Sequence, residues 1–214
     1  IDIDLLSRDF SINAIAFSFE EKLLIDPSNG IKDLQLAFLR TNSKQNLLND
    51  PLRILRCFRF VSELDFNVDE NLINFIKTYK NQLRLVSGER INYEIQRIIR
   101  GKKASQAIKL INKFKIFDYL QSDKNLIFFD LEKLNFEEFN KFERKNFLPL
   151  FFLVLILDEF SLKILKFRKS EVLKIKLLRK WNLLLKIKTI NEFNERERFD
   201  LHQELETILP SFIL

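Results

Sequence analysis

The stretch from Asp50 to Phe60 reads Asp-Pro-Leu-Arg-Ile-Leu-Arg-Cys-Phe-Arg-Phe. Asp50 followed by Pro51 is typical of a helix start, because an aspartate oxygen accepts the free N–H groups of a first turn and proline is tolerated only in that turn. We therefore expect a helix that begins at Pro51. Three arginines recur at every third position, so such a helix would hold their guanidinium groups within an arc of about 120°; they are Arg53, Arg56 and Arg59.

A second row beside these arginines is apolar and can be buried; it comprises Leu52, Leu55, Phe58 and Val61. No carboxylate follows Arg53 or Arg56 at helical pairing distance, and the nearest acidic residue is Glu63, four positions after Arg59. Three largely unpaired guanidinium groups favour an anionic guest, and their N–H forks suit phosphate oxygens and base edges. The same pattern also fits a solvated helix face on which Asp50 is only an N-cap.

Four segments resemble, in order, the motifs of the class II tRNA nucleotidyltransferase and bacterial poly(A) polymerase family. Asp50–Phe60 is similar to its nucleotide-selecting motif E-D-x-x-R-x-x-R. Ser7–Ala14, read as Ser-Arg-Asp-Phe-Ser-Ile-Asn-Ala, is similar to R-R-D-F-T-I-N-A. Asp26–Leu34 resembles the turn D-P-x-G-G-x-x-D-L, and Ser87–Ile91 resembles the helix start S-x-E-R-I.

Three positions depart from the family pattern. Asn49 stands where the family has glutamate, which removes a carboxylate expected to support the arginines. Ser7 replaces the first arginine of its motif, and Asn29 replaces the first glycine of the turn.

The resemblance implies template-independent addition of CMP or AMP to an RNA 3′ end, above all that of tRNA, from ATP or CTP. Asp50 and Arg53 would then read the edge of the incoming base, and Asp9 would contact its ribose. The family implies triphosphate contacts for three arginines, Arg8, Arg56 and Arg59. The Ser87–Ile91 helix start would brace the arginine helix through Glu89 or Arg90.

The resemblance also implies Mg²⁺, with its carboxylate ligands upstream of Ile1. The chain contains no methionine and opens on Ile1, so we expect a fragment without the catalytic part of the head and without activity alone. Asp2 and Asp4 have the spacing of paired metal ligands on a strand. They lie too close to Arg8 and Asp9 for that role, so we assign neither a catalytic nor a metal-binding residue.

The predicted fold is mainly α, with a small α/β remnant of a nucleotidyltransferase head before an all-helical neck and body. We expect strands over 11–20, 23–25 and 38–40 and a short helix over 31–36. After Gln45 the apolar pattern is helical, including the stretches 137–144, 148–160, 162–167, 170–188 and 192–209. The predicted division is 1–45 head remnant, 46–102 nucleotide-selecting neck and 103–214 RNA-binding body.

Composition narrows the class of protein further. The net charge of +6 and pI near 9.3 favour a polyanionic partner. The single cysteine, Cys57, is flanked by apolar residues and is expected to be a buried thiol, which fits a reducing cytoplasm. The single histidine, His202, provides neither a triad nor a histidine metal site. The longest apolar run, 148–157, is shorter than the ~20 residues of a membrane-spanning helix.

A second basic region lies between Leu162 and Trp181. An apolar stripe is expected to be buried there; it comprises Leu173, Ile175, Leu177, Leu178 and Trp181. The RNA-contacting residues predicted on the opposite face are Lys166, Arg168, Lys169, Lys174 and Lys176. A solvated face has the same composition. The alternative function is therefore a non-catalytic basic helical module that binds RNA or protein by charge, and the sequence also leaves open a product without function.

Overall fold

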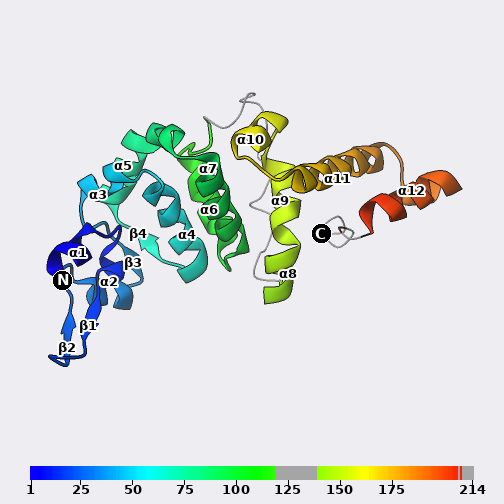
Figure 1. Ribbon diagram of the computed structural model, residues 1–214. Coiled ribbons are helices and arrows are strands. Elements are labelled where there is room, and N and C mark those ends of the chain that lie inside the picture. The colour runs from blue at the N-terminus through cyan, green and yellow to red at the C-terminus, as the bar shows by residue number, and fades with distance from the viewer. Residues whose placement is uncertain (119–138, 207, 209–214) are drawn as a thin grey trace. The chain divides into compact units, whose positions relative to one another are not determined.

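The computed structural model describes residues 1–118, 139–206 and 208. Its contacts divide the chain into two compact units, Ile1–Tyr119 and Leu120–Leu214. The boundaries predicted after residues 45 and 102 both fall inside the first unit, and the three-part division stays a prediction. The mainly α fold is confirmed, and Figure 1 shows the short strands gathered near the N-terminus.

The first unit opens with helix α1, Asp2–Ser7, and a 3-10 turn, η1, over Ser11–Asn13. Strands β1, Ala16–Ser18, and β2, Leu23–Ile25, form an antiparallel hairpin. The strand predicted from residue 11 is thus shorter than expected. Its first residues turn because the Ser11 hydroxyl donates to the buried Asp33 carboxylate and the Asn13 amide donates to Asp9.

The turn before helix α2, Gly30–Gln35, explains one departure from the family pattern. Asn29 has φ of 56°, in the left-handed region that asparagine tolerates better than most residues with a side chain. The Asp26 carboxylate accepts the N–H groups of Gly30 and Ile31 at 2.6 and 3.0 Å. A Cβ on Gly30 would lie 2.1 Å from the Ser11 carbonyl oxygen, so glycine is required only at this second position.

The first unit continues, over its described residues, through helix α4, Arg53–Leu64, and seven further elements. They are β3 (Phe38–Leu39), α3 (Lys44–Asn49), β4 (Asn67–Val68), α5 (Glu70–Tyr79), η2 (Lys80–Leu85), α6 (Gly88–Arg100) and α7 (Ala104–Lys113). Strands β3 and β4 pair in parallel. Helices α6 and α7 pack against α4, which lies beside them in Figure 1.

Helix α4 begins two residues later than predicted. Pro51 and Leu52 form a turn, in which the Asp50 carboxylate accepts the Leu52 N–H at 3.3 Å and the Asp50 carbonyl accepts the Arg53 N–H at 3.0 Å. Asp50 therefore caps the segment as expected, while the regular helix starts at Arg53. The predicted apolar row is buried, as expected; it comprises Leu52, Leu55, Phe58 and Val61.

The described part of the second unit is helical. It contains α8 (Lys141–Asn146), α9 (Leu148–Ile156), α10 (Glu159–Ile164), α11 (Lys169–Ile187), η5 (Ile190–Glu192) and α12 (Glu195–Leu205). Its core contains Leu178, Trp181, Phe193, Leu205 and Ile208. Residues 137, 138, 207 and 209 of the predicted helices lie outside the described residues. No described helix is long and apolar enough to cross a membrane.

One part of the predicted stripe on α11 is wrong. Ile175, Leu178 and Trp181 are buried, but Leu173 is 59% exposed. Leu173 and Ile175 are two positions apart, which corresponds to about 200° around a helix, so the two side chains point to opposite sides. The buried stripe follows the three-residue spacing of Ile175, Leu178 and Trp181 instead, and Leu177 is half-buried beside it.

Candidate functional site

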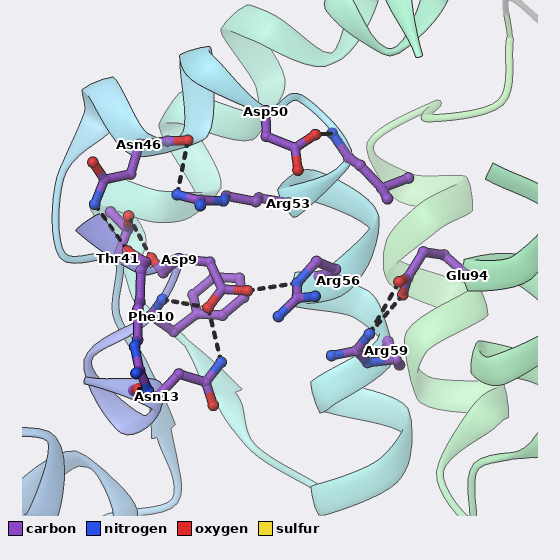
Figure 2. A network of polar contacts seen from close by, with 12 residues as sticks. Asp9, Phe10, Asn13, Thr41, Asn46, Asp50, Arg53, Arg56, Arg59 and Glu94 are labelled. Carbon is purple, nitrogen blue, oxygen red and sulfur yellow. Dashed lines mark hydrogen bonds and ion pairs between the residues drawn. The ribbon is translucent and has the colours of Figure 1, made fainter. Parts of the chain in front are cut away.

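The first unit contains a polar cleft of about 550 Å³. It is lined by Arg8, Asp9, Asn13, Asp50, Arg53, Arg56, Arg59, Phe60 and Arg97. All six residues predicted to contact nucleotide are among them, and Figure 2 shows most of this set at close range. Five arginines against two aspartates give the lining an excess of positive charge.

Asp9 lines this cleft, is buried and is held by three donors. Its Oδ1 accepts the Phe10 N–H at 3.0 Å and the Asn13 amide at 2.8 Å. Its Oδ2 accepts Nε of Arg56 at 2.5 Å, so a head residue fixes a helix α4 residue (Figure 2). This contact uses Nε of Arg56 and leaves its two terminal nitrogens for another acceptor.

Arg53 is fixed by backbone carbonyls. Its Nη1 donates to the Ser7 carbonyl at 3.0 Å and to the Asn46 carbonyl at 3.1 Å. The Asn46 amide in turn donates to the carbonyls of Leu6 and Arg8 at 2.6 and 2.8 Å. Helices α1, α3 and α4 are thereby joined beside the cleft, and both contacts of Arg53 use only one of its nitrogens.

Arg59 is buried, and its side chain is only 5% exposed. Its Nη1 donates to both oxygens of the buried Glu94 at 3.0 Å (Figure 2). Glu63 lies 3.6 Å from Arg59 Nε and also accepts two hydrogen bonds from Arg97. Burial raises the pKa of Glu94 and lowers the pKa of Arg59, because both charged forms leave water, and each partner's charge offsets part of the shift.

The expectation that these arginines are largely unpaired is therefore wrong. Arg56 and Arg59 bind Asp9 and Glu94, which lie 47 and 35 positions away in the sequence. A search for carboxylates one helical turn away cannot find such partners. The guanidinium groups are pre-oriented by the chain itself, which favours binding of a guest in one defined geometry.

Helix α6 braces the start of α4, as the family resemblance implied. Arg90 Nη2 donates to the Asp50 carboxylate at 2.9 Å. Ser87 occupies the N-cap position of α6 without a capping hydrogen bond from its side chain. Asn49 is exposed and accepts the Gln45 amide at 2.8 Å, so the asparagine that replaces the family's glutamate contacts its own helix.

The side chains considered for other chemistry do not form a second site. Asp2 and Asp4 lie on a helix instead of a strand, and Asp4 pairs with Arg8 at 3.1 Å. Among the residues that the structure describes, no three His, Cys, Asp or Glu side chains are placed to hold a metal ion. Cys57 is buried on α4; burial raises the pKa of its thiol, and the charge of Asp9 raises it further. It is therefore no activated nucleophile.

The second basic region surrounds a smaller cavity of about 370 Å³ where α10 meets α11. It is lined by Glu159, Leu162, Lys163, Lys166, Phe167, Lys169, Val172 and Lys176. Three of the five predicted RNA contacts are in this lining, and Lys176 pairs with Glu159 at 3.1 Å. The other two, Arg168 and Lys174, are exposed nearby on the chain.

Four residues of the cleft and its support were not predicted as site residues: Asn13, Phe60, Glu94 and Arg97. Asn13 holds Asp9 through its side-chain amide. The only signal for Glu94 is that a buried arginine such as Arg59 requires a carboxylate partner. The sequence does not show which carboxylate pairs with that arginine.

Two family models match the chain. Residues 1–40 match the poly A polymerase head domain, and residues 65–124 match the "probable RNA and SrmB-binding site of polymerase A". The chain resembles the tRNA nucleotidyltransferase and poly(A) polymerase family. The motif-based resemblance is thereby confirmed, and the matches flank the arginine helix on both sides.

Named proteins and solved structures that are similar to this chain support the same resemblance. A CC-adding tRNA nucleotidyltransferase of Synechocystis is 35% identical over 106 residues, which are 50% of this chain and 26% of that protein. The crystal structure of the Bacillus stearothermophilus CCA-adding enzyme in complex with CTP shares the fold with a TM-score of 0.75 at 24% identity, over 97% of this chain and 52% of that one. A Thermotoga maritima CCA-adding enzyme complexed with tRNA gives 0.69 at 22%, over 99% and 55%. The matched part of this chain thus spans about a quarter of that curated relative.

Proposed function

We propose that this chain is the nucleotide-selecting and RNA-contacting part of an RNA nucleotidyltransferase that adds CMP or AMP to tRNA 3′ ends. The observation that carries the proposal is the gathering of six motif residues from two chain segments around one cleft. The similarity to a CC-adding tRNA nucleotidyltransferase supports the choice of reaction, and the fold shared with an enzyme complexed with CTP supports the choice of substrate.

In this proposal the base of the incoming nucleotide lies against Asp50 and Arg53. A carboxylate accepts hydrogen bonds and a guanidinium donates them, so the pair offers both halves of a Watson–Crick edge. Arg90 holds the carboxylate, and two backbone carbonyls hold the guanidinium. Because neither side chain moves freely, the protein presents a fixed pattern in place of a template base.

The phosphates lie against the arginines beyond the base. Arg56 keeps two nitrogens that its contact with Asp9 does not use, and Arg8 and Arg59 add further positive charge. The Asp9 carboxylate lies between them and provides an acceptor for a ribose hydroxyl, which favours a ribonucleotide. Guanidinium forks bind phosphate oxygens in pairs, so this part of the cleft orients the triphosphate as well as neutralising it.

The family implies magnesium ions, which would neutralise charge on the transferred phosphoryl group and activate the attacking hydroxyl. The described residues of this chain contain no ligand set that fits such an ion. The proposed role of the chain therefore includes no metal-dependent step. It consists of binding, selecting and orienting the nucleotide.

The RNA strand would meet the lysines around the second cavity. Lysines neutralise backbone phosphates without reading sequence, which suits a partner recognised by its charge and shape. The five residues proposed for this contact are Lys166, Arg168, Lys169, Lys174 and Lys176.

Equilibrium binding of labelled CTP and ATP to the 214-residue chain tests the nucleotide site. We expect both to bind and Arg53→Ala to weaken them by roughly 10- to 100-fold, the range for hydrogen bonds to a charged group. Lys174→Gln is the matched control and should leave nucleotide affinity unchanged. Incorporation of CMP and AMP into tRNA lacking its 3′ end is then measured with the full gene product that contains this chain.

Two results would contradict the proposal. The first is equal nucleotide binding by the parent chain and Arg53→Ala. The second is RNA binding without any nucleotide incorporation by the full gene product, with that binding abolished when Lys174 and Lys176 are both replaced by glutamine. That second pattern would favour the basic binding module.

A further inference from the structure

Helix α6 presents a partly exposed row whose central residue, Tyr93, has no role in the proposed nucleotide site. Arg90, Tyr93 and Arg97 follow one another at steps of three and four residues, so they share one face of the helix. Tyr93 is 61% exposed. The opposite face of α6 carries the isoleucines that pack inward; they are Ile91, Ile95, Ile98 and Ile99.

Both neighbours of Tyr93 in this row reach the cleft. Arg97 lines it, and the Arg97 guanidinium carbon lies 6.0 Å from the centroid of the Tyr93 ring. Arg90 binds the carboxylate of Asp50, which also lines the cleft. The exposed tyrosine ring therefore stands on one helix face with an arginine that lines the cleft and an arginine that binds a residue of the cleft.

The two arginines retain donors for a further acceptor. Arg97 uses Nε and Nη2 to bind Glu63, and Arg90 uses Nη2 to bind Asp50. These contacts do not use Nη1 of either side chain. An isolated exposed tyrosine is ordinary on a protein surface. Proteins that bind unpaired nucleotides combine a positively charged groove with aromatic rings on which bases stack. Here an exposed ring stands between two oriented guanidinium groups beside an arginine-rich cleft.

We propose that Tyr93 is a stacking platform for an unpaired base of the RNA strand whose 3′ end enters the cleft, with Arg90 and Arg97 contacting the adjoining phosphates. This inference rests on the proposed function and adds the position of the acceptor strand. Stacking is tolerant of base identity because every base presents a π face, so the platform holds the strand without selecting its sequence. Selection stays with Asp50 and Arg53.

The test measures binding of a 5′-labelled single-stranded RNA ending in ACC to the 214-residue chain by fluorescence anisotropy. We expect Tyr93→Ala to weaken binding by about 5- to 100-fold, the range for loss of one stacked base, and Tyr93→Phe to stay within about twofold. Phe199→Ala removes an aromatic ring of similar exposure, 64%, from α12 and should change nothing. Affinity for CTP without RNA should be the same in all three variants.

A photocrosslink tests for direct contact with RNA, because a tyrosine with only a structural role would not form one. RNA carrying 5-iodouracil at one of its last three positions should crosslink to Tyr93, and the adduct should be found by mass spectrometry of the digested chain. Retained RNA affinity in Tyr93→Ala, a crosslink mapped elsewhere, or no detectable RNA binding by the parent chain would each overturn the platform. Failure of the parent chain to bind CTP would instead count against the proposed function.

Discussion

The two basic regions of this molecule hold their positive charges in different ways. In the cleft of the first unit, Arg56 and Arg59 are anchored by the buried carboxylates of Asp9 and Glu94. In the second unit, Lys176 is 53% exposed and pairs with an exposed glutamate. Anchored guanidinium forks present donors in a fixed geometry, whereas lysines on flexible stems present only charge. The first arrangement suits choosing one nucleotide, and the second suits contacting a backbone of any sequence.

The two regions also differ in how far apart along the chain their residues lie. The cleft joins segments 35 to 47 residues apart through single ion pairs. The lysine region is built by α10, α11 and their short connection. Removing one anchor should therefore disturb the whole cleft, while removing one lysine should disturb little beyond its own surroundings.

The largest expected effect follows from breaking the buried pair between Arg59 and Glu94. Glu94→Gln leaves the Arg59 charge buried without its counter-charge, which costs about 3–5 kcal/mol in the free energy of unfolding. Urea unfolding followed by circular dichroism measures this loss. Glu63→Gln, which alters a more exposed partner of the same arginine, is the control and should cost much less. Equal effects of the two variants would remove the distinction between anchored and exposed charge.

A smaller effect is expected from releasing Arg56. Asp9→Asn keeps the size of the side chain and removes the charge that Arg56 Nε contacts. CTP affinity should fall by about tenfold, corresponding to roughly 1.4 kcal/mol, because the guanidinium group loses its fixed direction and the ribose its acceptor. Isothermal titration provides the affinity. Asp4→Asn removes an exposed carboxylate paired with Arg8 and should keep CTP affinity within about twofold of the parent.

The smallest effect is expected from the lysines. Lys169→Gln and Lys174→Gln together should weaken RNA binding only severalfold, and the slope of log affinity against log salt should become shallower by about 0.7 to 0.9 for each phosphate that the protein no longer neutralises. The measurement is a salt titration of RNA binding. Lys141→Gln, an exposed lysine on α8, should leave the slope unchanged. A large drop in affinity for the lysine pair at constant slope would indicate a specific pocket instead of a charged surface.

The sequence predicted the helix-rich fold and six of the nine residues that line the cleft, because local patterns and the family motifs point to them. Asp69 caps α5 and the Leu23–Ile25 strand forms where turn residues bound it. The arginine spacing placed three cleft residues on one helix, and the motif before Ala14 supplied two more. Where the prediction was wrong, the deciding contact was distant in sequence. The buried Asp33 converts the start of the predicted strand into a turn, and Asp9 and Glu94 pair arginines that a local search finds unpaired.

Cys57 lies on α4 between the residues that face the cleft, and it is fully buried. Cys57 is the single cysteine of the chain, so a thiol-specific reagent can modify the chain only at this position. An alkylating reagent can reach its sulfur only when the packing around α4 transiently opens, so the rate of alkylation in the native protein reports how often this part of the first unit opens. A nucleotide bound in the cleft between α4 and the segment around Asp9 would lower that rate by a factor that grows with the nucleotide concentration divided by its dissociation constant. The alkylation rate of Cys57 thus measures how often the site opens locally.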